Sequence, residues 1–349
     1  MDDYLQQMDA ALRPVAPPVV LEGVYTDDQH RRIVDVIKGN GPWPTITAHH
    51  FDTVEELIAT TSGPMRGAGD LTLDDIATGH FRGYLAQDSV NYFDDLRDTF
   101  YNDKFLDLVR DYWNVPLAKP TSTLFNLCGP HHSGLNAHLD AVTFRGIRIE
   151  NTPVWLLNTM AKSGLFMDHV VKMAQVITWW YLGENGTFTY WPDGPTGQPK
   201  VLGHPMWNKG VVVQNELMFH RGDPVGRPDE RDIPGLKHRS MMGYDSARDC
   251  WDITTDGEII RTYRPDEMRL LVHWSAELYD SIDEVHKVMD HSDDLTHDIV
   301  FERLLADMRA KGTKVADPSD PLHDSEFIRA LIGTYTIAPM TEWLDAPAA

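Results

Sequence analysis

The chain has few cysteines, few basic residues and no long apolar run, and each shortage argues against a class of protein. Cys128 and Cys250 are the only cysteines in 349 residues and no CxxC is present, which argues against a disulfide framework or a thiolate zinc site. No window approaches the roughly 18 apolar residues of a membrane span, and the first residues lack the basic and apolar regions of a secretory signal. We therefore expect a cytoplasmic, soluble protein with no membrane partner.

Acidic residues outnumber basic ones by a wide margin. Lys and Arg total 31 against 53 Asp and Glu, which gives a formal net charge of -22. This field repels phosphate backbones, so no nucleic-acid partner is expected. The 42% hydrophobic content is enough to bury a full core, and the 16 histidines can supply metal ligands where cysteines are lacking.

The chain divides into three regions that we expect to form one integrated domain. Residues 1–120 are predicted to be a mostly helical support region, with a capping box from Thr26 to Gln29 and a second helix start at Asp52. Residues 121–279 contain short runs of branched and aromatic residues between turn signals, which predict an antiparallel sandwich or barrel. Its expected strands are 121–127, 135–144, 176–182, 187–191, 211–219, 239–244 and 269–274.

Helical patterns interrupt and follow these strands. Residues 154–172 predict a helical insertion, either a lid or a helix that covers one face of a sheet. Lys162 and Lys172 within it could meet an anionic substrate, although solvated helix faces explain them equally well. Residues 280–349 predict a helical C-terminal extension, which is a candidate for packing or for contacts in a homo-oligomer.

One H-x-D tripeptide lies where it could bind a metal. Oxygen activation at iron(II) needs two histidines and one carboxylate on one face of the ion, and residues i and i+2 of a strand point the same way. The tripeptide occurs three times, beginning at His50, His138 and His291. The first lies at a helix start and the third in a charged stretch, so His138 and Asp140, in a predicted strand, are the candidate ligands. A helix cap or a solvated pair is the alternative interpretation.

The second histidine ligand is expected on a later strand. His220 directly follows the run 210–219, which contains a predicted strand, and the turn signals after it direct the chain away. His204 lies in a predicted loop, while His238 and His273 are expected to be ordinary strand or core residues. His220 is therefore the best candidate.

This order of motifs resembles a known family. The H-x-D tripeptide, a hairpin containing YLGENGTFTYWP and the segment GVVVQNELMFHRG are similar to the iron(II)/2-oxoglutarate-dependent dioxygenase superfamily, particularly its phytanoyl-CoA dioxygenase-like branch, over about residues 120–275. The resemblance implies an α+β fold with a double-stranded β-helix, a cupin-like jelly roll, flanked by N-terminal helices. It also implies that His138, Asp140 and His220 are the catalytic ligands of Fe(II), with 2-oxoglutarate as cosubstrate and O2 as oxidant. The implied reaction hydroxylates a small-molecule substrate and releases succinate and CO2.

The family also carries an arginine after the distal histidine, which holds the far carboxylate of 2-oxoglutarate through its planar guanidinium. Arg239 opens a predicted strand and is our preferred candidate, although it is farther from His220 than is usual. Arg231 has the more familiar spacing but lies in a Pro/Asp-rich loop, and Arg221 and Arg227 are expected in solvent. Polar neighbours of the ligand strand are further candidates for cosubstrate or substrate binding: Asn126, His131, His132 and Asn136.

Two other functions remain open from the sequence. A cupin-type metal-dependent isomerase or hydrolase would use the same ligands without 2-oxoglutarate, and succinate production separates it from the oxygenase. A non-enzymatic jelly-roll binding protein would contain His138 and Asp140 incidentally, so replacing them would leave its metal content unchanged. The aromatic residues of the hairpin are expected mainly in the core, with one or two lining a substrate pocket: Trp179, Trp180, Tyr181, Tyr190 and Trp191.

Overall fold

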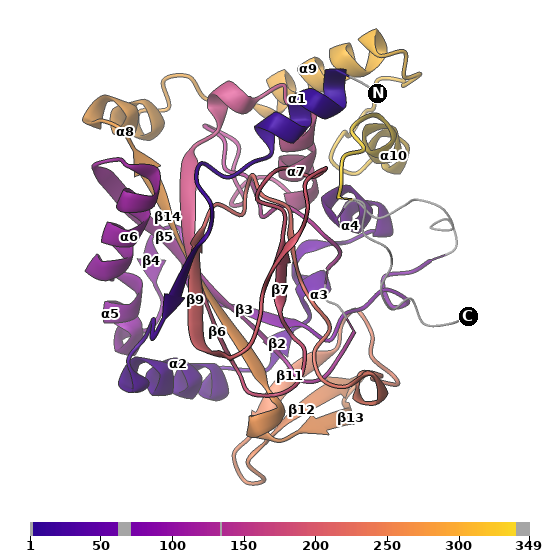
Figure 1. Cartoon of the computed structure of the whole chain (residues 1–349). Helices are drawn as coiled ribbons and strands as arrows, with labels where there is room; N and C mark the ends of the chain where they lie inside the picture. Colours follow the sequence, from indigo (N-terminus) through magenta and orange to yellow (C-terminus); the bar gives the residue numbers. More distant parts are fainter. Residues whose placement is uncertain (1–2, 62–70, 133–134, 340–349) are drawn as a thin grey trace.

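The computed structural model describes residues 3–61, 71–132 and 135–339, and a seven-stranded antiparallel sheet forms its centre (Figure 1). The interior strand β6 (Lys172–Tyr181) is almost entirely buried, as expected for a strand that is covered on both faces. The strand order is β1-β9-β6-β14-β5-β3-β4. The other strands are β1 (Val19–Glu22), β9 (Met206–Val213), β14 (Arg269–Tyr279), β5 (Leu117–Cys128), β3 (Phe81–Gln87) and β4 (Val90–Asn91).

A smaller antiparallel sheet packs against one end of the large one. It has the order β10-β7-β8 and consists of β10 (His220–Gly222), β7 (Phe188–Tyr190) and β8 (Lys200–Leu202). Phe188 and Leu202 from this sheet share a buried apolar cluster with Trp179 of β6 and Val211 of β9. The two sheets therefore face each other across a common core.

A third sheet separates β10 from β14 in the sequence. It contains β11 (Met241–Asp245), β12 (Cys250–Thr255) and β13 (Glu258–Tyr263), with the short β2 (Trp43–Pro44) at one edge. Figure 1 shows this meander at one end of the molecule, away from most of the helices.

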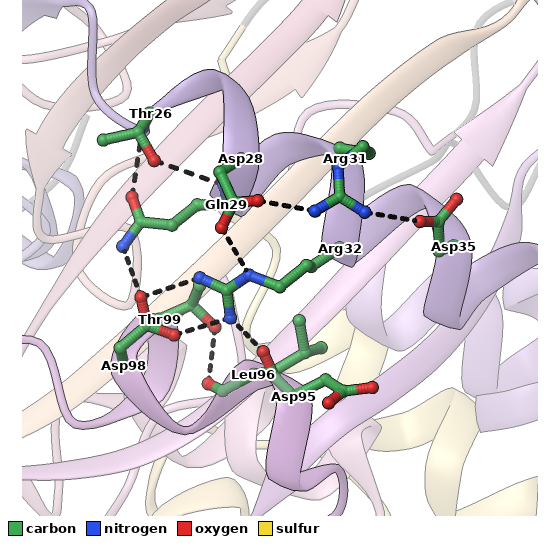
Figure 2. Close-up of polar contacts among 10 residues, drawn as sticks. All are labelled: Thr26, Asp28, Gln29, Arg31, Arg32, Asp35, Asp95, Leu96, Asp98 and Thr99. Atoms are coloured by element: carbon green, nitrogen blue, oxygen red, sulfur yellow. Dashed lines mark hydrogen bonds and ion pairs between the residues drawn. The ribbon is translucent and has the colours of Figure 1, made fainter.

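Helices cover the outer face of the large sheet. Apolar residues of α2 (Asp27–Gly39), η2 (Asp94–Leu96), α5 (Arg97–Phe100) and α6 (Asp103–Trp113) join the sheet in one core cluster. The predicted capping box between Thr26 and Gln29 is confirmed at the start of α2. Arg32 of α2 forms an ion pair of 2.8 Å with Asp98 of α5 (Figure 2), and because this pair is exposed it orients the two helices more than it stabilises them.

A second helical layer packs beside the sheets and has its own apolar core. All residues of α7 (Val154–Ser163) after Val154 are buried, so this helix is a core element rather than a lid. Lys162 lies inside this layer and donates hydrogen bonds to the carbonyls of Ala59 (2.7 Å) and Thr60 (3.2 Å), so it meets neither solvent nor a substrate. The layer also contains α1 (Asp3–Ala11), α4 (Val54–Thr61), α9 (His297–Ala310) and α10 (Ser325–Thr334).

The remaining short elements lie at the ends of the strands and helices. They are α3 (Ile46–His50), η3 (Met167–His169), η4 (Pro228–Glu230), η5 (Pro265–Glu267) and α8 (Ile282–Met289). Lys172 forms ion pairs with Asp280 (2.5 Å) and with Glu284 of α8 (2.9 Å), which places it away from a substrate role. No helix in the described part of the chain is both long and apolar enough to cross a membrane.

The structure confirms a mixture of helices and antiparallel sheets but corrects several predicted elements. The first 120 residues are not only helical, because β1 and β3 enter the large sheet. The predicted strand 135–144 is wrong: this segment makes only isolated bridges, between His138 and His220 and between Phe144 and Val170. The predicted strand 211–219 ends early, since β9 stops at Val213.

Candidate metal centre

His138 and His220 are neighbours because their backbones pair directly. The amide of each residue donates to the carbonyl of the other at 3.0 Å, which forms an isolated antiparallel bridge at the start of β10. The two imidazole rings lie 4.5 Å apart between centroids. One bridge thus aligns two side chains that are far apart in the sequence.

Asp140 completes a compact group of three side chains. Its backbone amide donates to the Asn215 carbonyl at 3.1 Å, and its Oδ1 lies 3.5 Å from the Nε2 of His220. One candidate ligand atom each from His138, Asp140 and His220 lies within 4.8 Å of the others. The structure therefore brings together the three residues that the sequence singled out.

Backbone carbonyls hold both imidazoles in the tautomer that a metal requires. The Nδ1 of His138 donates to the Asn136 carbonyl at 2.7 Å, and the Nδ1 of His220 donates to the Met218 carbonyl at 3.0 Å. A carbonyl can only accept, so each Nδ1 carries the hydrogen and each neutral ring keeps its lone pair on Nε2. Burial lowers the pKa of His138 to about 3, which keeps its ring neutral.

Asp140 has a buried oxygen that no hydrogen-bond donor satisfies. Burial by itself would raise the pKa of Asp140, but His220 and His273 together lower it well below its usual value. The Nε2 of His273 lies 3.3 Å from Oδ2 without the alignment of a hydrogen bond, so Oδ2 has no such partner among the described residues. Two imidazoles held through Nδ1 and an ionised carboxylate with an unsatisfied oxygen fit a divalent transition metal such as iron(II). His273, expected to be an ordinary strand or core residue, thus lies against a candidate ligand.

Three arginines of the described residues line the cavity around this group, and one of them, Arg148, is paired with Glu277. Arg269, at the start of β14, is only 2% exposed and donates from Nε to the Gly186 carbonyl at 2.9 Å. Its Nη2 is buried without a hydrogen-bond partner among the described residues. Arg82 on β3 is already engaged, because it donates to Asn126 Oδ1 at 2.8 Å and lies 2.8 Å from the Nε2 of His50. Arg269 is therefore the guanidinium with an unused buried donor.

The two arginines expected to bind the cosubstrate lie elsewhere. Arg239, the preferred candidate, is exposed in the turn before β11 and lines a separate hollow with Asp52 and Asp74, so it does not line the cavity of the candidate ligands. Arg231 is buried, but its Nε and Nη2 donate to the Gly226 carbonyl at 3.2 and 3.0 Å, and it does not line the cavity.

The predicted polar neighbours have mixed positions. Asn126 lines the cavity, where it accepts the Arg82 hydrogen bond, while Asn136 contributes its carbonyl to His138 and does not line the cavity. His131 is buried with its Nδ1 bonded to the Gly129 carbonyl, and the Nε2 of His132 lies 2.9 Å from Asp232 near the surface. Neither histidine lines the cavity.

Sequence reasoning missed a group of polar residues beside the candidate ligands. Glu216 is buried and lines the cavity, and its Oε1 accepts a short hydrogen bond from the Nε2 of Gln175. Burial and the nearby Asp140 raise the pKa of Glu216 to about 8. Asn215 also lines the cavity, and both residues follow the end of β9. The three consecutive polar residues Gln214, Asn215 and Glu216 interrupt the predicted strand 211–219, and they were the available signal that the regular strand ends there.

No family model matches this chain, and no curated protein matches it in sequence. Similar solved structures include an oxidoreductase of the 2OG-Fe(II) oxygenase family from Burkholderia pseudomallei, at 12% identity and a TM-score of 0.41 over 79% of this chain and 92% of that one. A Pseudomonas putida prolyl-4-hydroxylase is 10% identical over 79% and 100% of the two chains, with a TM-score of 0.34. HygX from Streptomyces hygroscopicus, with nickel, 2-oxoglutarate and hygromycin B bound, is 9% identical over 80% and 88%, with a TM-score of 0.35. Similarity this low does not indicate the activity of this chain.

Proposed function

We propose that this chain is a non-haem iron(II)- and 2-oxoglutarate-dependent oxygenase that hydroxylates a small organic molecule and releases succinate and CO2. The observation that supports it is the convergence of His138, Asp140 and His220 in a cavity that also contains the unused Nη2 donor of Arg269. Two antiparallel sheets that face each other across the cavity support a double-stranded β-helix as the fold. Membership of the phytanoyl-CoA dioxygenase-like branch stays a prediction.

The three ligands would hold the metal from one side. One ligand atom each of His138, His220 and Asp140 lies within 4.8 Å of the others, while the Nε2 of His273 lies 3.3 Å from the second carboxylate oxygen. When bound, iron with 2-oxoglutarate and O2 supplies the oxidising power that breaks a C–H bond of the substrate. Because Asp140 is an intact carboxylate, no ligand position is vacated for a halide, which disfavours halogenation.

Arg269 is the proposed anchor for the far carboxylate of 2-oxoglutarate. Its Nε is fixed by Gly186, which leaves Nη2 directed to a partner that the described residues do not supply. A charge-assisted hydrogen bond in a buried cavity is stronger than the same bond in water. Arg82 is the weaker choice, because Asn126 and His50 already engage its guanidinium.

Anaerobic reconstitution tests the metal and the cosubstrate together. Wild-type protein with Fe(II) and 2-oxoglutarate should develop the weak visible metal-to-ligand band of such complexes, and air should then release succinate. Asp140→Ala should lose both signals. Asp52→Ala is the matched control and should keep both, because Asp52 is the exposed aspartate of the H-x-D tripeptide that begins at His50.

The alternatives predict different outcomes. Bound iron without succinate would favour the metal-dependent isomerase or hydrolase. Metal content that is unchanged by Asp140→Ala would favour a non-enzymatic binding protein and would contradict the proposed function.

A further inference from the structure

The cavity wall beside Asp140 presents two buried oxygen acceptors that no donor satisfies. They are the Oε2 of Glu216 and the Oδ1 of Asn215, and neither has a hydrogen-bond partner among the described residues. Glu216 is 4% exposed and Asn215 is 1% exposed, so bulk water does not readily satisfy them. A buried polar atom without a partner is costly, which makes two of them in one cavity a sign of an absent ligand.

Gln175 determines which oxygen of Glu216 remains without a hydrogen bond. The Oε1 of Gln175 accepts a hydrogen bond from the backbone amide of Asn215 at 2.9 Å, so the Nε2 of Gln175 must point the other way. That Nε2 donates to Oε1 of Glu216. Since Gln175 is itself fully buried on β6, the carboxyl is held in place and only Oε2 remains for a ligand.

These acceptors lie next to the metal ligands. The carbonyl of Asn215 accepts the hydrogen bond from the Asp140 amide at 3.1 Å. Glu216 and Asn215 also line the same cavity as His138, Asp140 and His220. A molecule that binds to Glu216 and Asn215 would therefore lie beside the candidate metal ligands.

Among the residues that the structure describes, no cationic side chain forms an ion pair with Glu216. Two basic residues of the same cavity, Lys119 and Arg148, pair with Glu277 at 3.2 and 2.5 Å. The other two are Arg82, engaged by Asn126 and His50, and Arg269, the proposed cosubstrate anchor. No ion pair to Glu216 occurs among the described residues. Its raised pKa is the expected behaviour of a buried carboxyl that lacks a positive partner. The net charge of -22 would also attract cations toward the protein.

We propose that Glu216 and Asn215 bind a cationic nitrogen of the substrate, so that the molecule oxidised is a small organic amine in its ammonium form. An ammonium group has several N–H donors and no acceptor, which matches two unsatisfied acceptors and a carboxylate without a cation. This inference depends on the proposed function, because it assigns the substrate class of the same site.

Calorimetry on protein loaded anaerobically with Fe(II) and 2-oxoglutarate tests this assignment. Butylammonium is the probe, and 1-butanol and butyrate are the neutral and anionic comparators of similar size. Wild-type protein should bind butylammonium saturably and should bind neither comparator. Glu216→Gln keeps the shape but removes the negative charge, and it should weaken butylammonium binding on the order of tenfold to a hundredfold. Asn215→Ala should weaken it several-fold.

Glu150→Gln is the matched control, because Glu150 is an exposed carboxylate at the edge of the same cavity and should not change butylammonium affinity. Equal affinity of wild type and Glu216→Gln for butylammonium would overturn the assignment. So would a preference for butyrate, which would make Glu216 a protonated donor. The visible band of the metal complex is measured separately: a band without amine binding refutes only the amine, whereas a missing band refutes the oxygenase.

Discussion

Replacing Arg269 with lysine tests how the cosubstrate is held. Lysine keeps the positive charge but loses the planar fork, and therefore loses the geometry that directs Nη2 into the cavity while Nε holds Gly186. A charge-assisted hydrogen bond contributes about 1.5–3 kcal/mol, and about 1.4 kcal/mol corresponds to a factor of ten in affinity. We therefore expect Arg269→Lys to raise the KM for 2-oxoglutarate on the order of tenfold to a hundredfold.

The assay is succinate formation as a function of 2-oxoglutarate concentration, with iron content measured in parallel. Because Arg269 is not one of the three candidate ligands, iron content should stay the same and kcat at saturating 2-oxoglutarate should change much less than KM. Arg239→Lys serves as the control, since Arg239 lies in a different, exposed hollow. An unchanged KM in Arg269→Lys, or a raised KM in Arg239→Lys, would refute the assignment of the anchor.

Three further changes probe the site and its support. His273→Ala should keep one metal per chain but lower turnover on the order of tenfold, because Asp140 loses an orienting neighbour; metal analysis and succinate formation check this. Gly146→Ala should destabilise the fold by roughly 1–3 kcal/mol in denaturant titrations, since Gly146 has φ +83° and a Cβ there would lie 2.3 Å from the Leu295 carbonyl oxygen. Burial lowers the pKa of Lys162 from 10.5 to about 7, so the unfolded chain binds more protons between these values and the free energy of unfolding should rise with pH across that window. Lys162→Met should remove this rise, up to about 1.4 kcal/mol per pH unit, when its unfolding is compared with that of wild type.

The candidate ligands could be found from the sequence because their signals are local. An H-x-D tripeptide after a Gly/Pro-containing loop and a histidine after an apolar run are visible within a few residues. The capping box at Thr26 is equally local, and it is confirmed. Such signals need no knowledge of which strands pair.

The anchoring arginine could not be found in the same way. The family pattern places it on the strand after the distal histidine, but here the meander β11, β12 and β13 lies between β10 and β14. Arg239 was preferred because it opens the first strand of that meander, whereas Arg269 opens the strand that returns to the large sheet. Only the pairing of β14 with β5 and β6 shows which strand lies beside the cavity.

The irregular segment from Gln214 to Phe219 positions several polar groups of the site. In a regular strand two consecutive side chains point to opposite faces, so a continuous strand through 211–219 would have turned either Asn215 or Glu216 out of the cavity. Because β9 ends at Val213, both side chains line the cavity, while the Asn215 carbonyl holds the Asp140 amide and His220 pairs with His138. This irregular segment thus supports the candidate ligand Asp140 on the opposing loop segment, leads into the candidate ligand His220 and presents the proposed amine-binding acceptors. The predicted strand 211–219 was therefore wrong after Val213, where a regular strand would have kept either Asn215 or Glu216 out of the cavity.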